Sequence, residues 1–319
     1  MTTTSEGSMA VGAYPQAAVV SAPAHQITVC ICSFKRAELL NRLLMKLDQQ
    51  QTQGLFAYSI VVADNDSMRS AEPVVAAFRS TTHLPVAYCI EPQQNIALAR
   101  NRALQRAEGD LVAFIDDDEF PADDWLCNLF KMYKASGADG VLGPVKPYFE
   151  TEPMSWVKRG GFFDRPTHPT GHRMNWGQSR TGNVLFRKDI LNGLGNPFRS
   201  EFGMAGEDMD FFRRAMNTGC TFVWCNEAVA YEEVPPSRCT RSYLLKRALL
   251  RGSNFPKHPE QRVRNLIKSL IAVPCYVVCL PVVALFGHHV LLKYLIKLCD
   301  HASRLLAFLG LSVVTERQT

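Results

Sequence analysis

Short apolar runs alternate with amphipathic segments between residues 27 and 115, and this alternation is what most restricts the fold. The apolar runs are Ile27–Cys32, Tyr58–Ala63, Val86–Ile90 and Leu111–Ile115. Leucines at 39, 40, 43, 44 and 47 follow a helical period, and a second helix is expected from Ile96 to Ala107, with Gly109 as its stop. Strand–helix alternation of this kind predicts an α/β fold with a mostly parallel central sheet and helices on both faces.

Polar side chains follow several of these runs. They are Ser33 after the first run, Asp64 and Asp66 after the second, and the consecutive Asp116, Asp117 and Asp118 after the run at 111–115. Open α/β sheets bind ligands at the carboxyl ends of their strands. Adjacent carboxylates repel one another, and the hard cations Mg²⁺ and Mn²⁺ are their usual partners. A solvated turn with Asp123 or Asp124 capping the next helix is the simpler alternative.

Two familiar phosphate or metal motifs are absent from these junctions. Cys32-Ser33-Phe34-Lys35-Arg36 stands where a dinucleotide-binding fold has its glycine-rich loop, which argues against hydride transfer. The acidic cluster does not match a calcium-binding loop either, because Pro121 takes the place of the required glycine.

Composition narrows the compartment and the partners. The 319 residues carry a net charge of +5, too mild to imply nucleic acid. Ten scattered cysteines show no zinc-knuckle or redox spacing, which favours a reducing compartment. Residues 1–25 lack a secretory signal and are expected to be a flexible tail, so we expect the catalytic part to be cytoplasmic.

The second half of the chain holds two further motifs after a stretch rich in glycine, proline and aromatic residues at 143–180, where we expect acceptor-binding loops. Thr181-Gly182-Asn183 precedes an apolar run, and Gly206-Glu207-Asp208-Met209-Asp210-Phe211 begins an expected helix. Acids in a first helical turn are often only partners of the helix dipole, an alternative that applies to Glu207 and Asp210.

Together these motifs, with Gln94-Asn95-Ile96-Ala97-Leu98-Ala99-Arg100-Asn101, resemble the family 2 glycosyltransferases of the GT-A (nucleotide-diphospho-sugar transferase) fold. The resemblance spans about residues 26–250, and its nearest variety is the glucosyltransferases of succinoglycan-type exopolysaccharide synthesis. It implies a nucleotide-sugar donor, expected to be a UDP-sugar such as UDP-glucose, a Mn²⁺ or Mg²⁺ cofactor, and inversion at the anomeric carbon.

The resemblance also assigns roles. Asp208 matches the general base and Glu207 a residue that orients the site, while Asp118 matches the direct metal ligand and Asp116 its D-x-D partner. Donor-nucleotide contacts fall on Ser33, Phe34, Arg36, Asp64, Asp66, Asn95, Arg100, Asp116 and Asp117. Acceptor contacts are expected at Trp176, Thr181, Gly182 and Asn183. After a strand expected at Thr221–Tyr231, Glu232 or Glu233 stands where many relatives have a metal-binding histidine. Arg100 is alternatively a surface cation.

The C-terminal third suggests a membrane. Nine cations between 238 and 268 face one acid, and Ser269–Gly287 carries no charge but contains Pro274 and Pro281. Leucines interleaved with Lys293, Lys297 and Arg304 indicate an interfacial helix. We therefore divide the chain into a catalytic domain at 26–236, a basic linker at 237–268 and membrane-associated helices at 269–319, held on the anionic cytoplasmic face of the inner membrane. The alternative is that these helices pack on the catalytic domain or on a second subunit.

Three functions compete. The leading one is non-processive transfer of one sugar to a lipid-linked or glycan acceptor, because Gln-x-x-Arg-Trp is absent and too few apolar helices are present to enclose a channel. A nucleotidyltransferase would need a glycine-rich loop after the first strand. A membrane-associated glycan-binding scaffold has no physical need for carboxylates converging on one cleft.

Overall fold

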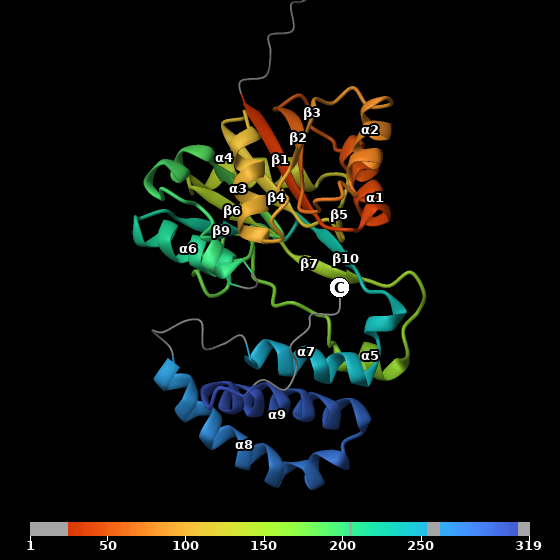
Figure 1. The fold of residues 1–319 in the computed structure, drawn as a ribbon, viewed down its shortest axis with the longest axis vertical. Coiled ribbons are helices and arrows are strands. Elements are labelled where there is room, and N and C mark those ends of the chain that lie inside the picture. The colour runs from red at the N-terminus through yellow and green to blue at the C-terminus, as the bar shows by residue number, and fades with distance from the viewer. Residues whose placement is uncertain (1–24, 204–205, 254–261, 312–319) are drawn as a thin grey trace, which may run out of the picture.

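The computed structural model describes residues 25–203, 206–253 and 262–311, and the tail expected at residues 1–25 lies almost entirely outside this part. A seven-stranded sheet forms the centre of the catalytic domain, in the order β3-β2-β1-β4-β8-β6-β9 (Figure 1). The strands are β1 (Gln26–Ser33), β2 (Ala57–Asp64), β3 (Val86–Ile90), β4 (Leu111–Ile115), β6 (Gly140–Leu142), β8 (Asn183–Arg187) and β9 (Phe222–Trp224). The strands from β3 to β4 are parallel, while β8 runs antiparallel to both β4 and β6. The predicted mostly parallel sheet is confirmed.

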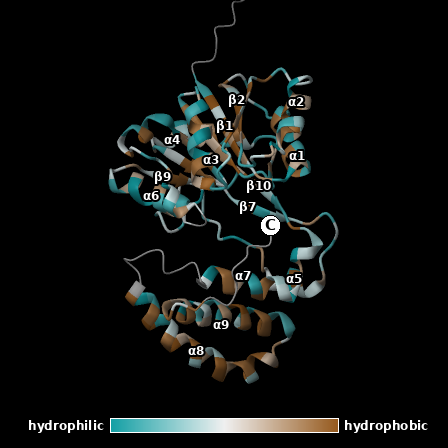
Figure 2. Ribbon diagram, viewed as in Figure 1, coloured by the Kyte–Doolittle hydropathy of each residue, from teal (hydrophilic) through white to brown (hydrophobic). Residues whose placement is uncertain are grey.

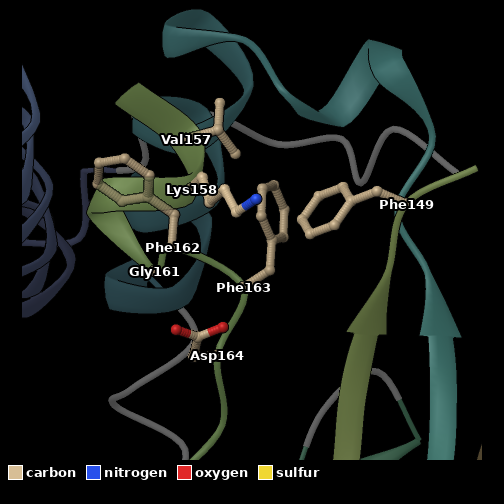
Figure 3. A pocket seen from close by; sticks show the side chains of 7 residues that line it. All are labelled: Phe149, Val157, Lys158, Gly161, Phe162, Phe163 and Asp164. Atoms are coloured by element: carbon tan, nitrogen blue, oxygen red, sulfur yellow. The ribbon is translucent and has the colours of Figure 1, made fainter. Parts of the chain in front are cut away.

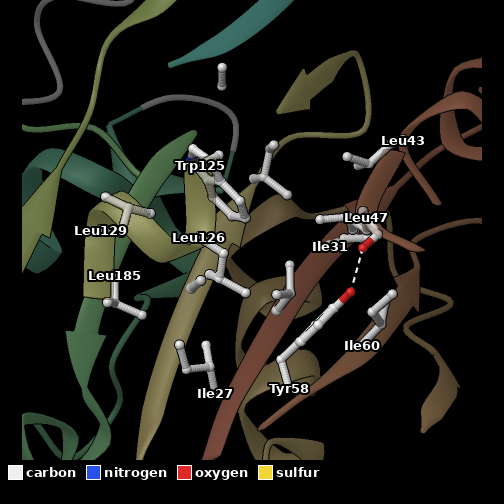
Figure 4. Close-up of a cluster of buried hydrophobic side chains, with 14 of the residues drawn as sticks. Ile27, Ile31, Leu43, Leu47, Tyr58, Ile60, Trp125, Leu126, Leu129 and Leu185 are labelled. Atoms are coloured by element: carbon white, nitrogen blue, oxygen red, sulfur yellow. Dashed lines mark hydrogen bonds between the residues drawn. The ribbon is translucent and has the colours of Figure 1, made fainter. Parts of the chain in front are cut away.

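Helices cover both faces of this sheet. They are α1 (Ala37–Asp48), α2 (Glu72–Arg79) and α4 (Trp125–Ser136) on one face, and α3 (Ile96–Arg106) and α6 (Glu207–Asn217) on the other. Each face of the sheet has its own core: the first core lies against α1, α2 and α4, and the second against α3 and α6. Because successive strand residues point to opposite faces, Ile27, Val29 and Ile31 join the first core and Cys30 joins the second. Tyr58 in the first core donates its hydroxyl to the carbonyl of Leu47 at 2.6 Å, which satisfies its polar end (Figure 4).

Two details differ from the sequence prediction. Gly109 was expected as a helix stop, but glycine is needed there because a Cβ would lie 2.4 Å from the carbonyl oxygen of Gln26. The strand expected at 221–231 is two strands, β9 and β10 (Ala230–Glu233), in different sheets. The second sheet has the order β5-β10-β7, with β5 at Glu119–Pro121 and β7 at Val145–Tyr148. It carries the chain from the acidic cluster toward the C-terminal helices (Figure 1).

A separate helical layer follows the catalytic domain. It contains α7 (Arg241–Ser253), α8 (Arg262–Ala284) and α9 (His288–Phe308), and α9 packs against α5 (Ser155–Gly160), α7 and α8. The predicted boundary at 268/269 falls inside α8. Among the described residues, one helix is long and apolar enough to cross a membrane, at Val263–Ala284, and only 11% of its apolar window is buried. In Figure 2 its apolar colour continues along the outer side of the layer.

The apolar face of α9 is covered by protein. Its leucines are buried or half-buried against neighbouring helices, so α9 is not the free interfacial helix that its pattern predicted. The apolar surface left exposed belongs to α8 instead, because α9 packs on only one side of that helix.

Candidate active site

The carboxyl ends of β1, β2 and β4 meet at one edge of the large sheet. Ser33 is in register with Asp64, and Asp116 directly follows the last residue of β4. Parallel neighbours place these residues together, as the sequence predicted. The site is therefore built on strand ends, with loops from the second half of the chain facing them.

Asp117 is buried and fixes the turn after β1. Its carboxylate accepts hydrogen bonds from the hydroxyl of Ser33 at 3.0 Å, the N–H of Phe34 at 3.4 Å and the guanidinium of Arg36 at 2.9 Å. Burial raises the pKa of Asp117 to about 6, although Arg36 opposes the shift. Lys35 in this turn has φ of 55°, a left-handed backbone that residues other than glycine seldom adopt. Asp117 thus holds Phe34 and Arg36 at the edge of the site.

Asp116 and Asp118 are more accessible than Asp117. The side chain of Asp116 is 42% exposed. Oδ2 of Asp118 lies 3.0 Å from a guanidinium nitrogen of Arg36 and 3.7 Å from one of Arg238. Burial raises the pKa of Asp118 despite these arginines. Both arginines contact the same oxygen of Asp118, which leaves its other carboxylate oxygen for a ligand.

Two further arginines, which the sequence analysis did not assign to the site, also contact the acidic cluster. Arg165 forms an ion pair with Glu232, and Arg238 lies 3.3 Å from the other carboxylate oxygen of Glu232. Glu232 was predicted as a metal ligand; the structure pairs it with these two cations, and its metal role stays a prediction. Its alternative, Glu233, is paired with Arg42. Only the tertiary structure reveals these pairs, because Arg165 is 67 residues from Glu232 along the chain.

Glu119 is a buried acid beside this cluster that the sequence analysis also missed. Its Oε1 has no hydrogen-bond partner, although Arg165 lies 3.5 Å away. Burial raises the pKa of Glu119 well above its usual range. Gly182 approaches it closely, since a Cβ at Gly182 would lie 2.8 Å from Glu119 and 3.0 Å from Asp116. A side chain at this glycine of the Thr-Gly-Asn motif would therefore displace the carboxylates of the cluster.

Arg100 joins the acidic cluster to the start of α6. Its guanidinium forms an ion pair with Glu207 and lies 3.5 Å from Asp116. Burial disfavours the charge of Arg100, but Glu207 and Asp116 outweigh this effect and raise its pKa. Since Arg100 is 6% exposed, the alternative that it is a surface cation is wrong. The predicted catalytic and donor-side residues are thus in direct contact.

Asp208 has weaker protein contacts than these neighbours. Its Oδ1 accepts the N–H of Met209 at 2.7 Å, and its Oδ2 lies 3.8 Å from Nε of Arg180. Gly206, with φ of 97°, turns the chain into α6 and places Asp208 in the first helical turn. By contrast, Asp210 in the same turn is buried, and its carboxylate accepts hydrogen bonds from Arg199 and Arg214. Asp208 is the acid in this turn with an accessible oxygen.

Asp64, Asp66 and Asn95 are held by neighbouring backbone groups. Asp64 is fully buried and accepts hydrogen bonds from Tyr88 at 2.9 Å and from the N–H groups of Asp66 and Ala71. Asp66 accepts the N–H of Met68 at 3.2 Å. Their contacts with a nucleotide require an exchange of these bonds and stay predictions.

Asn95 caps α3 by accepting the N–H groups of Ala97 and Leu98, and its amide donates to the carbonyl of Ser200. Asn65, which the sequence analysis passed over, holds the segment that leads to this cap. Its side chain donates to the carbonyl of Gln93 and accepts the N–H of Asn95. Asn95 therefore positions the helix that carries Arg100, and its contact with a donor stays a prediction.

The residues expected to contact the acceptor are buried or half-buried. Trp176 is half-buried against the second core, and Thr181 is 1% exposed. Asn183 is also buried, accepts the indole N–H of Trp125 at 2.8 Å and donates to the carbonyls of Pro144 and Ala228. Both amide hydrogens of Asn183 are used in these bonds, so Asn183 ties the start of β8 to its neighbours, and its contact with an acceptor stays a prediction.

Comparison with known proteins agrees with this arrangement. A family model for glycosyl transferase family 2 matches residues 28–192. The succinoglycan biosynthesis protein ExoM of Rhizobium meliloti is 30% identical over 304 residues, which cover 91% of this chain and 95% of that protein.

The chain belongs to glycosyl transferase family 2. It is a glycosyltransferase. Two solved structures share its fold. The first is the mannosyltransferase PcManGT from Pyrobaculum calidifontis with GDP-Man and Mn²⁺. It has a TM-score of 0.59 at 20% identity, and the match covers 91% of this chain and 88% of that one. S. aureus TarS 1–349 with UDP-GlcNAc has a TM-score of 0.52 at 16% identity over 90% and 92%. The predicted GT-A fold is confirmed.

In this family 2 glycosyltransferase, the sheet edge that carries Asp116 and Asp118 suits a hard divalent cation shared with phosphate. In the part of the chain that the structure describes, no three histidine, cysteine, aspartate or glutamate side chains are grouped to hold a metal by themselves. Asp116 and Asp118 nevertheless offer oxygens beside the unpartnered oxygen of Glu119. Such a partial oxygen set fits Mg²⁺ or Mn²⁺ when substrate phosphates supply the remaining ligands.

A small cavity lies elsewhere in this glycosyltransferase. It measures about 70 Å³ and is lined by aromatic side chains near α5, among them Phe149, Phe162 and Phe163 (Figure 3). Ligand pockets typically measure ~300 Å³ or more, so this cavity is too small for a nucleotide-sugar. None of the acids described above lines it.

Proposed function

We propose that this enzyme transfers one sugar from a UDP-sugar, with UDP-glucose the first to test, to a lipid-linked saccharide or polysaccharide precursor. Transfer would proceed by single displacement, with inversion at the anomeric carbon and with Mn²⁺ or Mg²⁺ bound. Two observations on relatives support this proposal. ExoM is a succinoglycan biosynthesis protein, and the TarS structures contain UDP or UDP-GlcNAc.

The observation that carries the proposal is the contrast between Asp208 and the acids around it. Glu207 is paired with Arg100, whereas within the described residues Arg180, at 3.8 Å, is the one cation within 4 Å of Oδ2 of Asp208. A general base must have a free oxygen within reach of the proton that it takes. Single displacement with inversion needs one such carboxylate, on the face opposite the leaving group. Asp208 meets this requirement.

The remaining residues divide the work of binding and orientation. Asp116 and Asp118 would hold the divalent cation, which when bound neutralises charge on the leaving diphosphate. Arg100, fixed by Glu207, orients Asp116 toward that edge. Ser33 and Arg36, through Asp117, hold the turn that contacts the nucleotide.

We further propose that the enzyme works on the cytoplasmic face of the inner membrane. One exposed apolar helix and the likeness to an exopolysaccharide biosynthesis protein support membrane association. The cations of α7 and of the start of α8 would face anionic headgroups. A nearby lipid-linked acceptor would then be delivered at the surface where the enzyme resides.

Calorimetric binding of UDP, GDP, CDP and dTDP, each with and without Mn²⁺, tests the proposal. We expect metal-dependent binding of UDP that is lost in Asp118→Ala and kept in Asp189→Asn, an exposed acid on the 3₁₀ helix after β8. Metal-dependent binding of a different nucleotide would mean that the donor carries that nucleotide and not UDP. Binding of no nucleotide would favour the glycan-binding scaffold.

A further inference from the structure

The outer side of α8 is an apolar surface without a protein partner in the described chain. Leu270, Ile271, Val277, Val278, Val282 and Phe286 are all more than half exposed, and from residue 269 to the end of α8 no charged side chain interrupts them. Exposed patches of this size mark interaction sites. We call the side of α8, continued into the turn after it by Phe286, that carries these six residues the outer face of α8.

The opposite side of α8 is fixed to α9, so the helix is not free to turn its apolar residues inward. Ser269 is fully buried and its hydroxyl lies 3.0 Å from Nδ1 of His301. Half-way along α8, the ring of Tyr276 meets Tyr294 edge-on at 5.6 Å. Two contacts far apart on both helices show that α8 and α9 run side by side over most of their length.

This pairing opposes a membrane-spanning α8. Lys293 and Lys297 are exposed and lie within one turn of Tyr294, which faces the middle of α8. If α8 crossed a bilayer, these lysines would be carried to its centre, at a cost of roughly 2.5 kcal/mol or more each. Next to them, Asp300 is bound to Arg251 of α7 and to Arg304, so α7 would be drawn in as well.

Charge identifies what covers the outer face. Arg264 and Lys268 are exposed on the first turns of α8, and the helix contains no acid. The acid of α9, Asp300, is already paired with Arg251 and Arg304. A second copy of α8 meeting this face would therefore offer these cations no acid, whereas anionic lipid headgroups supply the missing negative charge.

We propose that α8 lies in the plane of an anionic bilayer, with its outer face in the hydrocarbon of one leaflet and with neither α8 nor α9 crossing. This inference rests on the membrane location proposed above and sets its geometry. The lysines of α9 then stay at the headgroup level, and the catalytic domain stands on the same side as α7. Helices bound in this way bury their apolar face by ~5–10 Å.

Depth measurements along α8 test the geometry in the full-length enzyme. Cys275 and Cys279 are the cysteines that are exposed within the described residues. With both replaced by alanine, a single cysteine at Leu270, Val278 or Phe286 is labelled with a fluorophore. Quenching is measured in phosphatidylglycerol–phosphatidylcholine vesicles that carry bromine at a shallow or a deep acyl position. An in-plane helix gives all three labels the same shallow depth. A label at 278 much deeper than those at 270 and 286 would overturn the inference in favour of a spanning helix.

A charge on the outer face provides an independent readout. Val278→Asp is expected to weaken vesicle binding at least about tenfold, whereas the control Ala76→Asp, on an exposed position of α2, leaves it unchanged. UDP binding should be the same in both variants. A lipid-independent dimer that Val278→Asp dissociates would overturn the inference. Donor binding separates the proposals: vesicle insertion without nucleotide binding contradicts only the proposed sugar transfer, and nucleotide binding without insertion contradicts the membrane location and the geometry but not the transfer.

Discussion

At the scale of single residues, Asp117 holds the turn after β1 at the edge of the site. The pKa of its buried carboxyl is raised from 3.8 to about 6. Between these values the folded protein keeps a proton that the unfolded chain releases, so the stabilising effect of Asp117 falls as the pH rises through this window.

The stability difference between wild type and Asp117→Asn should therefore depend on pH. Asparagine does not titrate, so we expect wild type to gain up to about 3 kcal/mol relative to the variant between pH 7 and pH 4, at roughly 1.4 kcal/mol per pKa unit. Urea unfolding of both proteins at the two pH values measures this. A pH-independent difference would contradict the raised pKa.

Asp208 and Asp118 should fail in different ways. Asp208→Asn removes the proton acceptor and keeps the shape, so we expect kcat to fall by about 10²–10⁴-fold with donor affinity changed less than about twofold. Asp118→Ala should weaken metal-dependent donor binding itself. Steady-state kinetics and calorimetry on both variants separate the effects, and equal loss of donor binding would reject this division of roles.

Asn183→Ala should act on stability. The change leaves the indole N–H of Trp125 and the carbonyl of Ala228 without this partner, while the carbonyl of Pro144 keeps the N–H of Ala230. Buried polar groups left unsatisfied cost roughly 1–3 kcal/mol each. Thermal unfolding should shift clearly downward while KM for the acceptor stays unchanged in the folded fraction. A changed KM with unchanged stability would restore the acceptor role.

At the scale of elements, the helical layer depends on the close approach of α7 and α9. A Cβ at Gly252 would lie 1.8 Å from the hydroxyl of Ser303 and 2.5 Å from the carbonyl oxygen of Asp300. Gly252→Ala should therefore destabilise the layer by about 1–3 kcal/mol, more than alanine gains in helix propensity. Hydrogen exchange in α7 and α9 measures this. Gly193→Ala, where the added Cβ meets nothing within 4 Å, is the control.

At the scale of the whole molecule, the net charge of +5 is less informative than where the cations lie. Cations near an anionic surface contribute about 1 kcal/mol each, and salt screens them. The double variant Arg264→Gln/Lys268→Gln should bind anionic vesicles about 30-fold more weakly at ~0.05 M salt, and nearly as well as wild type at ~0.5 M. Arg106→Gln, on α3, should have no effect in cosedimentation. A salt-independent loss would indicate damage to the apolar contact instead.

The sequence by itself determined the first strands and the sheet edge at which their carboxyl ends meet. Strand and helix periods are local properties, so the strands before Ser33, Asp64 and Asp116 were predicted within one residue. Parallel pairing then requires their carboxyl ends to meet. Only the tertiary structure decided which cations face the acids, because Arg165 reaches Glu119 and Glu232 from a separate segment of the chain. It also decided which apolar face stays exposed, since the pattern of α9 does not reveal that neighbouring helices cover it. Local patterns determine which side chains a helix or strand carries on each face, and long-range packing determines which other segments contact that face.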